Sequence, residues 1–145
     1  MRALLDVNVL IALLDAGHIH HKLAMSWLEG EIGSGWASCP ITQNGCIRIM
    51  SQPNYPVALP AAQVAERLAE ASASADHVFW PADVNLLENG AVEWRRMLGH
   101  RQVTDAYLLA LAVRHGGRLV TLDRRIDPDV VHGARADQLV VLAKN

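Results

Sequence analysis

An aspartate interrupts the most apolar stretch near the start of the chain, and this feature limits the folds that the chain can adopt. Residues 4–15 read LLDVNVLIALLD, with Asp6 between apolar runs and Asn8 two positions later. An ionised carboxylate inside a core costs several kcal/mol unless a partner compensates its charge. Asp6 therefore ends a buried element at the edge of the core, caps the following helix, or is placed to bind a cation.

Apolar stretches of strand length alternate with stretches of helical periodicity along the chain. The patterns predict strands over residues 3–6, 35–39, 77–80, 118–123 and 138–142, and helices over 7–14, 21–32, 42–50, 61–73 and 103–115. Prolines make 51–60 a loop, and Gly116 and Gly117 end the last helix. This alternation predicts an α/β fold with a central parallel sheet and helices on both faces. A chain of 145 residues is expected to form one domain, residues 1–145.

The composition narrows the class of protein. Hydrophobic residues make up 51% of the chain, which argues against disorder. Thirteen basic and fifteen acidic residues give a net charge of -2, so any nucleic acid must be bound by a local patch. Cys39 and Cys46 are expected to be free thiols, and no stretch approaches the length of about 20 residues that spans a membrane. We therefore expect a cytoplasmic protein without membrane contact.

Three aspartates far apart in the sequence are predicted to meet at one edge of this sheet. Asp6 and Asp123 each end a predicted strand, and Asp105 lies in the first turn of a predicted helix. Ligands of open parallel sheets bind at the carboxyl ends of the strands, although each acid alone also suits a cap, a turn or a helix N-terminus. Two carboxylates about 4 Å apart repel by about 4 kcal/mol at an effective dielectric constant near 20. A cluster of three therefore needs protons or a divalent cation, and Mg²⁺ or Mn²⁺ there would activate water to hydrolyse a phosphate ester.

Three segments carry motifs that occur together in a known family. They are LLDVNVLIALL at 4–14, ITQNGCIRIMS at 41–51 and RQVTDAYLLALAVRHGGRLVTLDRRI at 101–126. In this order and spacing, they resemble the PIN-domain ribonucleases, and specifically the VapC toxins of type II toxin–antitoxin pairs. The resemblance implies a single PIN domain, a Mg²⁺ cofactor that Mn²⁺ can replace, and structured or single-stranded RNA (tRNA or ribosomal RNA) as the substrate. It also implies a small VapB-like antitoxin as the partner, and a homodimer.

The resemblance also assigns roles to individual residues. Five positions match the family's metal site: the acids Asp6, Asp105 and Asp123 bind the ion, and Asn8 and Thr104 support them. Gln43 stands where many members of the family carry a glutamate. An amide oxygen can place a metal ion or its water but brings no charge, so we expect weaker metal binding than in a relative with glutamate.

Other polar and aromatic side chains are candidates for RNA contacts or for a second metal site. Arginines near the three motifs are candidates for holding RNA phosphates: Arg48, Arg101, Arg124 and Arg125. The histidines of the HIHH cluster, at 18, 20 and 21, are predicted to be structural or to face solvent rather than to bind zinc. Trp27 and Trp80 are expected in the core, while stacking on unpaired bases stays open for Trp36 and Trp94.

Three functions fit parts of this pattern. The first is a metal-dependent endoribonuclease toxin, in which the three aspartates bind the cation and Gln43 helps to place the ion or its water. The second is a haloacid-dehalogenase-like phosphatase with Asp6 as the covalent nucleophile, in which Asn8 replaces the second acid and the available lysines are Lys22 and Lys144. The third is a catalytically weak PIN module that binds a partner protein. The three motifs together favour the endoribonuclease.

Overall fold

Five short strands form one parallel sheet in the computed structural model, which describes residues 1–142. The strands are β1 (Ala3–Leu5), β2 (Trp36–Ser38), β3 (His77–Phe79), β4 (Arg118–Thr121) and β5 (Leu139–Val141). They lie in the order β3-β2-β1-β4-β5, and every neighbouring pair is parallel. This confirms the predicted α/β fold with a central parallel sheet. Residues 143–145 of the predicted domain, Lys144 among them, lie outside the described residues.

The described residues form five α-helices, and their bounds agree closely with the predicted ranges. They are α1 (Val7–Leu14), α2 (His21–Glu31), α3 (Pro40–Met50), α4 (Ala61–Ser72) and α5 (Gln102–Arg114). α3 begins at Pro40, earlier than predicted, because proline has no N–H to leave unpaired in the first helical turn. α5 ends as predicted: Gly116 has a φ of 67°, and the N–H groups of Gly116 and Gly117 donate to the carbonyls of Val113 and Ala112.

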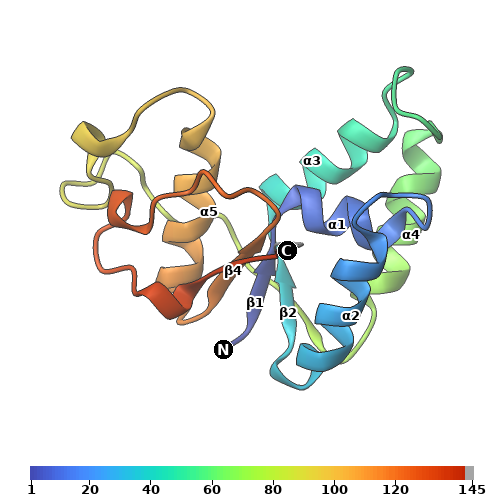
Figure 1. The fold of residues 1–145 in the computed structure, drawn as a ribbon, viewed down its shortest axis with the longest axis horizontal. Helices are drawn as coiled ribbons and strands as arrows, with labels where there is room; N and C mark the ends of the chain where they lie inside the picture. Colours follow the sequence, from blue (N-terminus) through green and yellow to red (C-terminus); the bar gives the residue numbers. More distant parts are fainter. Residues whose placement is uncertain (143–145) are drawn as a thin grey trace.

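Helices cover both faces of the sheet, as predicted. Figure 1 shows α5 on one side of β1 and β4, and α1 to α4 on the other side. The side chains of the central strand alternate between two cores. Leu4 packs in the cluster that contains α5, whereas Ala3 and Leu5 pack in the cluster that contains α1 and α3. None of these three residues is more than 1% exposed, so β1 is buried on both faces.

The strand order places a crevice at the carboxyl ends of β1 and β4. From β1 the chain moves outward through β2 to β3, and α5 then returns it to β4 on the other side of β1. Connections therefore leave β1 and β4 in opposite directions and do not cover the space beyond their ends. The pairing with β4 continues past β1, because the Asp6 N–H donates to the Val120 carbonyl at 2.9 Å. Asp6 is thus fixed at the carboxyl end of β1, beside β4.

Among the described residues, the cysteines form no disulfide and the helices are too short or too polar to span a membrane. Cys39 and Cys46 are both buried free thiols, as expected. Burial raises the pKa of the Cys46 thiol to about 11. None of the helices within residues 1–142 is long and apolar enough to cross a membrane.

Candidate active site

Asp6 lies directly after β1 and caps α1. Its backbone is extended, with φ -61° and ψ 158°, and its Oδ1 accepts a hydrogen bond from the Val7 N–H at 2.7 Å. Only 5% of the residue is exposed. Burial raises the pKa of its carboxyl group, while hydrogen bonds from Thr121 and Val7 act in the lowering direction. The Asp6 carboxylate therefore caps α1 and also lies near enough to Asp123 for the two charges to interact.

The hydroxyl group of Thr121, the last residue of β4, connects three of the predicted site residues. It donates to Asp6 Oδ2 at 2.7 Å, and it accepts from the Asn8 side-chain amide at 3.3 Å and from the Asp123 N–H at 3.1 Å. The Asn8 carbonyl oxygen in turn accepts from the Leu122 N–H at 3.2 Å. Thr121 is fully buried, and its one donor and two acceptor positions are all used inside the protein. The sequence prediction missed this residue, whose signal is a polar side chain at the end of an apolar strand.

Asp105 lies in the first turn of α5. Its side chain is half-buried, and within residues 1–142 no hydrogen bond compensates its charge. Burial, followed by the charges of Asp6 and Asp123, raises the pKa of Asp105 to about 7, while Arg125 acts in the opposite direction. The three acids therefore lie close enough for their charges to repel one another.

Asp123 follows β4 and is paired with Arg125. Its Oδ1 accepts from the Arg125 backbone N–H at 2.9 Å and from Nε at 3.0 Å, and its Oδ2 accepts from Nη2 at 3.0 Å. These bonds lower the pKa of the Asp123 carboxyl group. The three acids thus differ in the group that compensates their negative charge. Asp6 is hydrogen-bonded to a neutral hydroxyl group, Asp123 is paired with a guanidinium group, and Asp105 has neither among the described residues.

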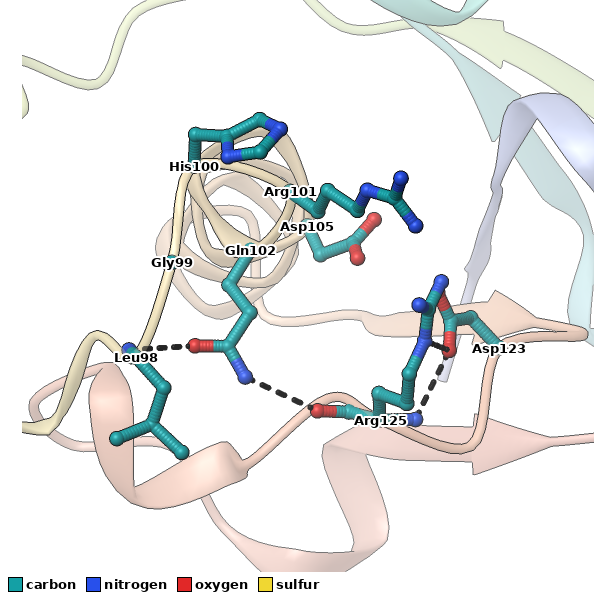
Figure 2. Close-up of a pocket in the computed structure, with 8 residues that line it drawn as sticks. All are labelled: Leu98, Gly99, His100, Arg101, Gln102, Asp105, Asp123 and Arg125. Atoms are coloured by element: carbon teal, nitrogen blue, oxygen red, sulfur yellow. Dashed lines mark hydrogen bonds and ion pairs between the residues drawn. The ribbon is translucent and has the colours of Figure 1, made fainter.

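A cavity of about 240 Å³ opens between the start of α5 and the loop after β4 (Figure 2). It is lined by Leu98, Gly99, His100, Arg101, Gln102, Asp105, Asp123 and Arg125. Gln102 connects the two sides of this cavity, because its Oε1 accepts from the Leu98 N–H at 2.8 Å and its Nε2 donates to the Arg125 carbonyl at 3.4 Å. Figure 2 shows the Asp105 carboxylate facing the Asp123–Arg125 pair, with the Arg101 side chain beside it. Negative and positive side chains therefore share one opening.

The chemistry of the acids fits a hard divalent cation, although their present orientation does not group them as ligands. Among residues 1–142, no three His, Cys, Asp or Glu side chains are close enough together to hold a metal ion. The oxygens of Asp6 and Asp123 are held by Thr121 and Arg125, while the raised pKa of Asp105 reflects its burial first and the nearby charges of Asp6 and Asp123 second. Mg²⁺ and Mn²⁺ prefer carboxylate oxygens. Binding such an ion here therefore requires the carboxylates to turn toward it.

Gln43 and Thr104 are not hydrogen-bonded to the three aspartates in the described part of the chain. Gln43 Nε2 donates to Ser38 Oγ at 3.1 Å, and Ser38 Oγ lies 2.8 Å from His77 Nε2. The Gln43 amide thus belongs to a polar chain that leads toward the edge strand β3. Thr104 is exposed, because one residue along a helix turns the side chain by about 100° from its neighbour Asp105. The hydroxyl group that supports the acids is that of Thr121 instead.

The arginines predicted to contact RNA lie in two places. Arg101 and Arg125 line the cavity. Arg124 is exposed in the same loop as Arg125, whereas Arg48 is exposed in the last turn of α3. The cavity therefore has two arginines of its own at its opening.

The histidine cluster and the tryptophans have mainly structural surroundings. His18 Nδ1 accepts from the His20 N–H at 3.0 Å, and His21 Nδ1 lies 2.7 Å from the Ala12 carbonyl, so these histidines stabilise the turn between α1 and α2. The tryptophans differ in exposure: Trp36 and Trp80 are 5% and 6% exposed, Trp27 is partly buried, and Trp94 is 46% exposed. Base stacking thus stays open for Trp94 and is excluded for Trp36 by its burial.

Comparisons with known proteins agree on one family. The PIN domain family model matches residues 3–128. The chain is 49% identical over 142 residues to Ribonuclease VapC44 of Mycobacterium tuberculosis, which covers 98% of this chain and 100% of that protein. It is 46% identical over 124 residues to Ribonuclease VapC39 of the same organism, covering 85% and 89%. The crystal structure of Mycobacterium tuberculosis VapC20, a sarcin-ricin loop cleaving toxin, matches with a TM-score of 0.56. The match covers 81% of this chain and 86% of that one at 15% identity, so it supports the fold alone.

Proposed function

We propose that this chain, which belongs to the PIN-domain family and within it to the VapC ribonucleases, hydrolyses RNA with the help of a divalent metal ion, Mg²⁺ or Mn²⁺. In this proposal, Asp6, Asp105 and Asp123 bind the ion, and Thr121 positions two of them. The observation that carries the proposal is the convergence of three carboxylates from distant parts of the chain, where burial of Asp105, followed by the charges of Asp6 and Asp123, raises its pKa to about 7. A bound divalent cation would lower the pKa of a water molecule and offset the charge that develops on the scissile phosphate.

The chain's own side chains supply negative charge, positioning and phosphate contacts. Thr121 donates from β4 to Oδ2 of Asp6, which keeps this acid close to the end of β1. Arg101 and Arg125 line the same cavity as Asp105, and guanidinium groups bind phosphate oxygens with two parallel hydrogen bonds.

Gln43 enters the proposal as a neutral group that helps to orient the ion or its water. Its amide nitrogen is already bonded to Ser38, so its carbonyl oxygen is the atom left for this role. Because that oxygen brings no full charge, its contribution to metal affinity is expected to be smaller than that of any one aspartate.

The substitution Asp6→Asn tests the proposal, with Glu66→Gln as its control. Asparagine keeps the size of the side chain, and its one carbonyl oxygen can cap α1 by accepting from Val7, although the hydrogen bond from Thr121 is then lost, so the fold of the variant is checked by circular dichroism. Cleavage of RNA in Mg²⁺ is expected to fall by about a hundredfold or more, because the lost charge removes several kcal/mol of stabilisation. Glu66 is exposed on α4, and its variant should cleave normally. Undiminished cleavage by a folded Asp6→Asn protein would remove the site.

We further propose an RNA loop of tRNA or ribosomal RNA as the substrate. The net charge of -2 and the arginine pair at the cavity favour a short exposed loop over a long duplex, because the basic patch is local. VapC20, which shares the fold, is a sarcin-ricin loop cleaving toxin. Sequencing RNA ends after brief expression in cells is expected to show one cut in a loop, and random cuts throughout duplex regions would contradict this.

A small VapB-like antitoxin is the proposed partner, acting on a homodimer of this chain in the cytoplasm. This proposal rests on the similarity of the chain, over most of its length, to VapC ribonucleases. Co-purification with the product of a neighbouring short reading frame, followed by size-exclusion chromatography with light scattering, tests both parts. Monomeric elution of the chain alone would refute the homodimer, and a complex that still cleaves RNA at full rate would refute the inhibitory partner.

No observation favours the phosphatase alternative. The Asn8 amide, which stands in the place of that family's second acid, is used in hydrogen bonds to Thr121 and Leu122. The cleavage assay above distinguishes the nuclease from the third candidate, a catalytically weak PIN module that binds a partner protein, because such a module would cleave RNA little or not at all in Mg²⁺.

A further inference from the structure

The guanidinium group of Arg125 uses both oxygens of the Asp123 carboxylate. Nε and Nη2 each donate at 3.0 Å, one to each oxygen, and the Arg125 backbone N–H adds a bond to Oδ1 at 2.9 Å. Bidentate pairs of this kind are among the strongest that side chains form. Asp123 therefore reaches the cavity with its oxygens already in use.

We propose that Arg125 is a positioning residue that competes with the divalent cation for Asp123 and is displaced when the cation binds. The inference rests on the proposed function, because it presumes a metal ion at the three acids. It assigns Arg125 a role in setting how tightly the site holds metal, separate from any contact that the same side chain makes with RNA.

The two partners of this pair differ in their freedom to move. The Arg125 side chain is 67% exposed, whereas that of Asp123 is 19% exposed. The Arg125 backbone is anchored on both sides, because its N–H donates to Asp123 and its carbonyl accepts from Gln102. The guanidinium group can therefore swing into solvent while the loop keeps its conformation.

The surrounding charges explain why a cation occupies this place. Asp6 and Asp123 both repel the Asp105 carboxylate, and Arg125 is the group that offsets this repulsion. A divalent ion carries twice the charge of the guanidinium group and would be attracted to the same carboxylates, and it would repel a guanidinium group beside it. Within residues 1–142 the acids do not group as ligands, which fits a carboxylate that is turned toward Arg125.

The test is the affinity of the purified chain for Mn²⁺, measured by titration calorimetry without RNA. Arg125→Gln is expected to bind Mn²⁺ about three- to tenfold more tightly than the wild-type chain, since the competing pair is lost. Arg101→Gln is the matched control, because it removes the same charge from the same cavity but no bond to Asp123. Its Kd is expected to fall by less than that of Arg125→Gln, because the Arg101 side chain lies beside Asp105 but holds neither oxygen of Asp123.

The outcomes separate this inference from the proposed function. If Arg125→Gln binds Mn²⁺ no more tightly than wild type, or only as much more tightly as Arg101→Gln, the competition is refuted while the metal site stands. If neither wild type nor Arg125→Gln binds Mn²⁺, the metal site itself is refuted. A second readout is the nuclear magnetic resonance signal of the Arg125 Nε–H group, which should shift when Mg²⁺ saturates the wild-type chain. An unmoved signal would contradict displacement.

Discussion

Replacing Asp105 with asparagine is expected to stabilise the metal-free protein at neutral and alkaline pH. The carboxylate of Asp105 is half-buried, lies near Asp6 and Asp123, and is the acid of the three without a hydrogen-bond donor in the described residues. Its ionisation therefore costs folding energy that a neutral amide of the same size avoids. Stability is gained at the expense of the charge that the proposed function requires.

The size of this effect follows from the pKa. The pKa of Asp105 is raised from 3.8 to about 7, and at about 1.4 kcal/mol per pKa unit the full difference corresponds to about 4 kcal/mol. Because solvent screens a half-buried group, we expect about 1–2 kcal/mol in practice. The folded state binds this proton more tightly than the unfolded state, so stability falls as the pH rises from about 4 to about 7. The whole cost is present above pH 7.

Urea denaturation in EDTA at pH 5, 6, 7 and 8 measures the difference between Asp105→Asn and wild type. The advantage of the variant should be small at pH 5, grow with pH and level off near pH 8. Adding Mg²⁺ should reverse the order, because the ion stabilises the wild-type site by mass action. An advantage that does not vary with pH, or a variant less stable than wild type at pH 8, would refute the raised pKa of Asp105 in the folded protein.

Three further outcomes are expected. Thr121→Val removes a buried hydroxyl group and leaves its three hydrogen-bond partners unsatisfied. The free energy of unfolding, measured by urea denaturation, should therefore drop by about 2–3 kcal/mol. A change below about 0.5 kcal/mol would contradict this network. Gly117→Ala places a Cβ atom 2.6 Å from the Arg2 carbonyl oxygen and should cost about 2–3 kcal/mol, whereas Gly30→Ala, with no atom within 4 Å, should be neutral or slightly stabilising. Arg101→Gln should weaken RNA binding in a cleavage-deficient background and reduce the slope of log affinity against log salt by about 0.7–1; an unchanged slope would place Arg101 away from the phosphates.

Much of the fold follows from local patterns in the sequence. The run VNVLIALL predicts a helix over 7–14, and α1 has these bounds. The glycine pair after α5 predicts the end of that helix, and Gly116 adopts the positive φ that this requires. Helical and strand periods are properties of the backbone geometry over a few residues, so neighbouring residues are enough to reveal them.

Parts of the candidate site depend on strand pairing and could not be predicted in this way. The sequence places Asp6 and Asp123 at the ends of strands, but the group that joins them is Thr121, which lies 115 positions from Asp6. Likewise, the side chain of Gln43 is bonded to Ser38 rather than to an acid. Such partners depend on which strand lies beside which, and on the rotamer that packing selects for each side chain.

The amino-acid sequence alone therefore determined the α/β alternation, the positions of the three acids and the family to which they point. Only the tertiary structure decided that Thr121 supports Asp6 and Asp123, that Arg125 pairs with Asp123, and that Asp105 is left without such a partner among the described residues. The physical reason is one of range: periodicity and capping act between residues a few positions apart, whereas hydrogen bonds and charges act through space once β4 lies against β1.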